Sequence, residues 1–237
     1  MPLCLSVGYF LMTFSTMLST MAVGMLRTFA IFFLTLLGSL PLGFLVYFGR
    51  QSKLEWTIPW IHVRIRPISA IVKAYIAVMR GTPLMLQLLI WYFGPYYLWG
   101  ASIRGYRFPA IILAFVFNYA AYFAEIYRGG IESIPAGQYE AAEVLGYTRT
   151  QTFFHIILPQ VVKRVLPPVT NEVITLVKDT SMAFTLAYNE VFSIAKQIAA
   201  SQTSFLPFVI AGVFYFIANY VVAFGMERIE KALDYYQ

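Results

Sequence analysis

The chain has 237 residues; 59% are hydrophobic, only 12% are charged, and the formal net charge is +6. Soluble domains average about 45–50% apolar and about 25% charged residues, so a soluble fold of this size could not bury so much apolar surface. In a membrane protein, excess Lys and Arg reflects cytoplasmic loops and anionic headgroups, so no nucleic-acid partner is expected. The single cysteine, Cys4, excludes an internal disulfide and a thiolate metal site, and we expect no metal site.

Five apolar segments predict membrane-spanning helices, because such a helix needs about 20 mainly apolar residues. The second segment is long and is interrupted at Gly81-Thr82-Pro83 and again near Gly94-Pro95. The fourth is the weakest, since it carries several polar and ionisable side chains. In chain order the five segments cover about 26–48, 71–98, 108–127, 165–187 and 205–226.

Residues 1–22 are apolar but punctuated by Ser and Thr. They predict an N-terminal segment that lies outside the membrane or in its outer interface, or a sixth partial span. The remainder, residues 23–237, is expected to form one membrane domain, because no large soluble domain and no clear repeat is evident.

Basic residues predict the orientation, since cytoplasmic loops carry the excess of Lys and Arg. The connectors after the first and third spans and the C-terminal tail hold ten, whereas the opposite side holds only Arg104, Arg107 and Lys196. The N-terminus is therefore expected outside and the C-terminus in the cytoplasm. The ten are Arg50, Lys53, Arg64, Arg66, Arg128, Arg149, Lys163, Arg164, Arg228 and Lys231.

A short motif lies in the predicted third connector. Glu140-Ala141-Ala142 is followed after three residues by Gly146, and Ile156-x-Leu158-Pro159 begins nine residues beyond that glycine. The two alanines favour a short helix that can approach a partner closely, and Gly146 can end it in a left-handed conformation. The pattern resembles the cytoplasmic coupling loop of ABC importer permeases, which implies a loop over residues 135–160 that docks on an ATPase subunit.

Two further stretches narrow the resemblance. Arg80-Gly81-Thr82-Pro83-Leu84 with Gln87, and the run from Asn118 through Tyr122 to Gln138, resemble segments of the polar amino acid permeases, the histidine, glutamine, arginine and cystine type. The resemblance implies an all-α membrane protein with the type I ABC importer fold and about five spans, in a bacterial cell membrane. It implies two permease subunits, identical or paralogous, two ATPase subunits and an extracytoplasmic amino acid-binding protein.

Ionisable residues inside the membrane usually mark a pathway. Arg80 precedes a break whose backbone N–H groups can face a cavity, a combination that suits a carboxylate. Glu172 and Asp179 are two helical turns apart, so they share a face that suits an ammonium group. The resemblance implies that substrate is held by Arg80, Gly81, Thr82, Asn118, Tyr122, Glu172 and Asp179.

Structural alternatives remain open for these charges. Arg80 could extend to the membrane interface, and Lys178 could pair with Glu172 or Asp179. Glu125 and Arg128, three residues apart, could form a structural pair.

No catalytic constellation and no phosphate-binding loop of the G-x-x-x-x-G-K-[ST] type is present in the sequence. The chain is therefore expected to be a transporter subunit without a cofactor of its own, with ATP and Mg²⁺ bound by the partner ATPase. The alternatives are an ATP-independent amino acid carrier or channel, an intramembrane enzyme, and a subunit that completes the pore for a paralogue. Which amino acid is carried stays open.

Overall fold

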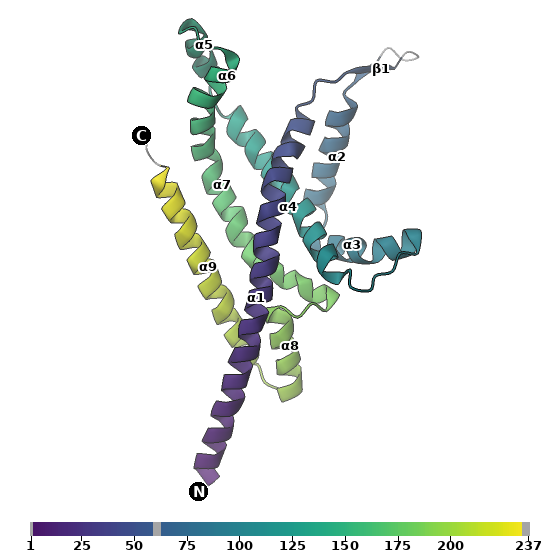
Figure 1. The fold of residues 1–237 in the computed structure, drawn as a ribbon, viewed down its shortest axis with the longest axis vertical. Coiled ribbons are helices and arrows are strands. Elements are labelled where there is room, and N and C mark those ends of the chain that lie inside the picture. The colour runs from purple at the N-terminus through teal and green to yellow at the C-terminus, as the bar shows by residue number, and fades with distance from the viewer. Residues whose placement is uncertain (1, 59–62, 234–237) are drawn as a thin grey trace. The chain divides into compact units, whose positions relative to one another are not determined.

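The structure, a computed structural model, describes residues 2–58 and 63–233. For residues 2–13, 57–58, 63 and 65 it describes the backbone only. The described chain is almost entirely helical (Figure 1). Its α-helices are α1 (Pro2–Arg50), α2 (Pro67–Gly81), α3 (Leu84–Trp99), α4 (Arg107–Glu132), α5 (Ala136–Val144), α6 (Arg149–Gln151), α7 (Leu158–Asp179), α8 (Val191–Gln202) and α9 (Leu206–Ala232). A π-helix, η1 (Thr152–Ile157), precedes α7, and a 3₁₀-helix, η2 (Thr180–Leu186), follows it.

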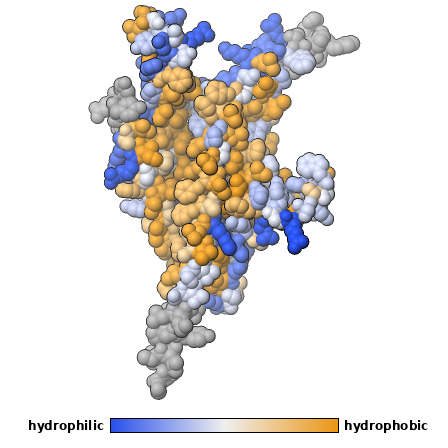
Figure 2. Space-filling model, viewed as in Figure 1, coloured by the Kyte–Doolittle hydropathy of each residue, from blue (hydrophilic) through white to orange (hydrophobic). Residues whose placement is uncertain are grey.

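Three helices within the described residues are long and apolar enough to cross a membrane: α1 from Phe14, α4 and α9. The pair α2 and α3 satisfies the same criterion when it is counted as one span bent at its break, which gives up to four. Figure 2 shows hydrophobic side chains along α9 and hydrophilic ones at its C-terminal end. The predicted fourth span, in α7, is long enough but too polar to be counted by composition.

The predicted break at Gly81-Thr82-Pro83 is confirmed, because α2 ends at Gly81 and α3 begins at Leu84. The predicted second break near Gly94-Pro95 is wrong, since α3 continues through both residues to Trp99. A proline removes only one backbone donor, and this helix tolerates that loss near its end. The helix α1 also passes position 22 without interruption, so residues 2–22 continue directly into the first span, and the placement of residues 1–22 outside the membrane stays a prediction.

The connector between α1 and α2 contains two short antiparallel strands, β1 (Trp56–Ile58) and β2 (Val63–Ile65), paired with Trp56 opposite Ile65. The sequence analysis expected helices alone. This connector is rich in β-branched and aromatic residues, which favour extended backbone.

The helices contribute to two compact units, of which the first comprises Met1–Leu34, Leu84–Ala114 and Ile174–Val222. In this unit the buried carboxylate of Glu190 caps α8 by accepting hydrogen bonds from the backbone N–H groups of Phe192 (2.7 Å) and Ser193 (2.6 Å). It also accepts a bond of 2.7 Å from the Tyr215 hydroxyl of α9. A buried carboxylate needs such donors, and here they join α8 to α9.

The second unit comprises Thr35–Pro83, Phe115–Val173 and Ala223–Gln237. Its first core contains buried residues of α1, α2 and α4, including Tyr47, Ile76 and Ala124. The helices α1 and α4 approach closely, because a Cβ at Gly43 would lie 2.8 Å from the Cβ of Phe123. The candidate site is built on this unit.

Candidate functional site

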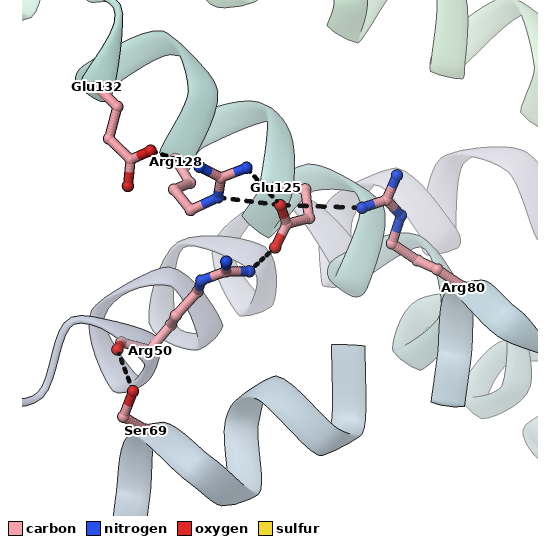
Figure 3. Close-up of polar contacts among 6 residues, drawn as sticks. All are labelled: Arg50, Ser69, Arg80, Glu125, Arg128 and Glu132. Atoms are coloured by element: carbon pink, nitrogen blue, oxygen red, sulfur yellow. Dashed lines mark hydrogen bonds and ion pairs between the residues drawn. The ribbon is translucent and has the colours of Figure 1, made fainter. Parts of the chain in front are cut away.

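An ion-pair cluster surrounds Glu125 in the second unit (Figure 3). Arg128, one turn further along α4, donates from Nη2 to Glu125 Oε2 at 2.9 Å, and Arg50 at the end of α1 pairs with the other carboxylate oxygen. Arg80 of α2 reaches Glu125 Oε2 at 3.9 Å. Glu132 pairs with Arg128 in turn. The Glu125 side chain is only 14% exposed, so three arginines share one nearly buried carboxylate.

The structural pair of Glu125 and Arg128, which the sequence analysis left as an alternative, is confirmed by this contact. The participation of Arg50 was missed, because a cation in a predicted connector gives no signal that it turns back toward a helix of the bundle. Ser69 fixes the end of α1 from the other side, since its hydroxyl donates to the backbone carbonyl of Arg50 at 2.8 Å.

Three of the predicted substrate-binding residues lie together on α2 and α4. The guanidinium carbon of Arg80 is 5.2 Å from the centre of the Tyr122 ring, a distance that allows a cation–π interaction. The side-chain amide of Asn118 donates to the backbone carbonyl of Met79 at 3.0 Å, directly beside Arg80. Arg80 remains 44% exposed, so the guanidinium is held in place and still accessible.

The two residues that follow Arg80 lie at the break itself. Gly81 is the last residue of α2 and is exposed. The hydroxyl of Thr82 donates to the carbonyl of Val78 at 2.8 Å, which satisfies one of the carbonyls that a helix C-terminus leaves open.

Glu172 and Asp179 both lie on α7 and are both partly buried. Glu172 belongs to the second unit, with Arg80, Asn118 and Tyr122, whereas Asp179 belongs to the first. The three residues of α2 and α4 are thus brought together, and the contribution of both acids to the same site stays a prediction.

The predicted coupling segment is a short helix with a well-defined end. The helix α5 carries Glu140, Ala141 and Ala142, and Gly146 follows it with φ of +78°. The N–H of Tyr147 bonds to the carbonyl of Ala142 at 3.0 Å, and that of Gly146 to Glu143 at 2.9 Å. This pair of bonds is the Schellman motif, which places glycine at the left-handed position.

Ala141 and Ala142 of α5 lie on different faces, although both were expected to face a partner. Ala142 is 1% exposed and therefore packs against its own chain, whereas Glu140 and Ala141 are exposed. Beyond the helix, Ile157 and Val161 form a buried cluster with Ile134.

Three apolar side chains of the same loop remain outside this cluster, and Figure 2 shows apolar and hydrophilic side chains mixed at this end of the second unit. Val144 is 87% exposed, Leu145 is 72% exposed and Phe154 is 58% exposed. Phe154 lies within the π-helix η1. Together these side chains form an apolar surface next to Glu140 and Ala141.

With three long apolar helices and one bent pair among the described residues, the chain has the composition of a multi-span membrane protein. Residues 62–235 match the family described as "Binding-protein-dependent transport system inner membrane component". The chain is 35% identical to the L-cystine transport system permease protein TcyB of Bacillus subtilis, over 73% of this chain and 74% of that protein. It is 38% identical to the arginine transport system permease protein ArtQ of the same organism, over 71% of this chain and 76% of that protein.

Solved structures agree with these relatives. A crystal structure of an amino acid ABC transporter with histidines has 27% sequence identity and a TM-score of 0.80, over 93% of this chain and 97% of that one. The MetNI methionine ABC transporter, at 22% identity and a TM-score of 0.65, covers 92% of this chain and 96% of its own and shares the fold.

The chain belongs to the family of binding-protein-dependent transport system inner membrane components. It is the membrane-embedded permease subunit of an ABC importer, and its fold is the predicted all-α type I importer fold.

Proposed function

We propose that this permease carries a polar amino acid across the bilayer. It would act as one of two permease subunits, identical or paralogous, coupled through α5 to two ATPase subunits. An extracytoplasmic amino acid-binding protein delivers the cargo. The observation that carries the proposal is the grouping of Arg80, Asn118 and Tyr122 at the break of α2, in a chain whose relatives are amino acid permeases.

The chemistry of an amino acid supports this cargo. Its carboxylate needs a charged donor, and Arg80 keeps an accessible guanidinium beside an aromatic ring. Its ammonium group needs an acceptor, and α7 offers Glu172 and Asp179. In the membrane, such a zwitterion would be costly to bury without both partners.

The coupling surface supports the ATPase partners. The helix α5 is anchored to its own chain by the buried Ala142. Its exposed Val144 and Glu140 present an apolar and a charged group that suit a groove in another protein. The ATPase subunits would bind ATP and Mg²⁺, and the permease would need no cofactor of its own. This coupling would require α5 in the cytoplasm, and with the five predicted spans the C-terminus would lie there too and the N-terminus outside. The distribution of Lys and Arg supports this orientation.

Uptake by the reconstituted complex tests the proposal. The permease, its ATPase subunits and the binding protein are incorporated in proteoliposomes, and uptake is measured across a panel of amino acids with and without internal ATP. We expect ATP-dependent uptake of a polar amino acid that falls at least about tenfold for Arg80→Gln, which corresponds to about 1.4 kcal/mol of lost binding. The matched variant Lys196→Gln, an exposed cation of α8, should leave uptake unchanged.

Two outcomes would contradict the proposal. Uptake without ATP would identify a carrier or channel. Unchanged uptake for Arg80→Gln, Glu172→Gln and Asp179→Asn alike would mean that this subunit only completes a pore for its partner.

A further inference from the structure

An open pocket of about 640 Å³ lies in the second unit, where the end of α1, the strand connector and the start of α2 meet. Four cations line it, Arg50, Arg64, Arg66 and Lys73, together with two carboxylates, Glu55 and Glu132. We call it the basic pocket. Figure 2 shows hydrophilic side chains gathered in this region.

Among the described residues, the ion pairs of the pocket leave Lys73 without a carboxylate partner and Arg64 with only a distant, shared one. Glu55 accepts from Arg66 Nη2 at 2.9 Å, and Glu132 is engaged by Arg128, outside the pocket lining. Arg50 is engaged by Glu125.

Arg64 and Lys73 are these remaining cations. Arg64 is 77% exposed, and its guanidinium lies 3.9 Å from Glu55, a carboxylate already bonded to Arg66. Lys73 is exposed, and within the described part of the chain it makes no ion pair. A guanidinium and an ammonium group in one pocket suit the oxygens of a phosphate group.

The surroundings favour a phosphate that is attached to a lipid. Trp56 is 65% exposed, Ile71 is 70% exposed and Phe48 is 53% exposed, and all three lie within a few residues of the pocket lining. Aromatic residues are enriched at the membrane interface, and exposed apolar side chains next to a polar pocket match the boundary between a headgroup and its acyl chains. A soluble anion would make no use of this apolar border.

We propose that the basic pocket binds the phosphate of an anionic phospholipid headgroup, through Arg64 and Lys73. The site adjoins the coupling loop, because Glu132 in the pocket wall precedes the start of α5 by four residues. The inference uses only the membrane embedding of the chain, and neither its cargo nor its ATPase partners.

Lipid retention by the purified full-length permease complex tests this site. The complex is titrated in detergent with phosphatidylglycerol and with phosphatidylcholine, and the bound lipids are counted by native mass spectrometry. Each basic residue near an anionic surface contributes about a fivefold gain in affinity, so Arg64→Gln with Lys73→Gln should weaken phosphatidylglycerol binding by about 30-fold. Phosphatidylcholine binding should not change.

Two matched variants make the result specific. The charge-conserving pair Arg64→Lys and Lys73→Arg should keep the affinity within about fivefold, a change equal to one cation. The pair Lys53→Gln and Arg228→Gln removes the same charge from exposed positions outside the pocket lining and should have less than a twofold effect.

Equal loss in the control pair would overturn the proposal, since it would show general attraction by net charge. Displacement of phosphatidylglycerol by an equal concentration of inorganic phosphate would identify a small-anion site and would also overturn it. Because the measurement needs no amino acid, ATP or binding protein, its failure would leave the proposed transport function unaffected.

Discussion

Replacement of Glu125 by Gln should destabilise the second unit, because one carboxylate serves three arginines there. Arg50 and Arg128 have side chains that are 23% and 29% exposed, so both would keep a poorly solvated charge without its partner. Loss of one member of a buried ion pair costs about 3–5 kcal/mol. The partial exposure of these arginines, and of Arg80 at 44%, lowers the expected loss to about 2–3 kcal/mol.

The assay is thermal or denaturant unfolding of the permease in a fixed detergent. Glu132→Gln is the matched control, since Glu132 is 51% exposed and, among the described residues, forms an ion pair only with Arg128. It should cost less than about 1 kcal/mol. A double-mutant cycle with Arg128→Gln should give a coupling energy of at least about 1 kcal/mol with Glu125. Equal losses for the two glutamates would refute the reasoning, because they would mean that burial and shared pairing have no role.

Three further predictions concern packing and coupling. Gly130→Ala should destabilise by about 1–3 kcal/mol in the same unfolding assay, because its Cβ would lie 2.2 Å from a valine side chain of α7. Gly129→Ala, in the same helix with nothing within 4 Å, should instead stabilise by up to about 1 kcal/mol. Gly146→Ala should cost about 1–2 kcal/mol through its left-handed conformation and lower cargo-stimulated ATPase activity, whereas Gly137→Ala, with ordinary φ and open space, should change neither. Val144→Ser should lower the affinity for the ATPase subunits about tenfold at unchanged stability, and an unchanged affinity in a pull-down titration would place the docking surface elsewhere.

Local sequence signals predicted the features that depend on local physics. The Gly81-Thr82-Pro83 run predicted the break of the second span, because proline has no N–H to continue the helical hydrogen bonds and glycine is a poor helix former. Gly146 predicted the end of α5 for the same kind of reason, and its φ of +78° agrees. Neither feature depends on contacts with distant parts of the chain.

Tertiary contacts were harder to predict. Nothing in the neighbourhood of Arg50 shows that its side chain reaches a glutamate 75 residues later, because that contact is created by the packing of α1 on α4. The burial of Ala142 inside its own loop had no local signal either. The strands β1 and β2 were missed because only helices were expected in this chain. β-Branched and aromatic residues alternate with polar ones in this connector, a pattern that favours strands.

The geometry of the second unit limits where the coupling loop can bend. The connector between α4 and α5 is held at three points: the Ser133 N–H bonds to Gly129, the Ser133 carbonyl accepts from Arg164 at 2.6 Å, and Ile134 is buried against Ile157. We therefore expect a displacement of α5 to move the end of α4 and the start of α7 with it, because these contacts tie the connector to both helices. The last two turns of α4 carry Glu125 and Arg128, and Glu125 also pairs with Arg80 of α2, so we expect the same displacement to reach Arg80 through this shared carboxylate. In this arrangement the ion-pair cluster would link the proposed ATPase-binding loop to the break that the proposed cargo would contact.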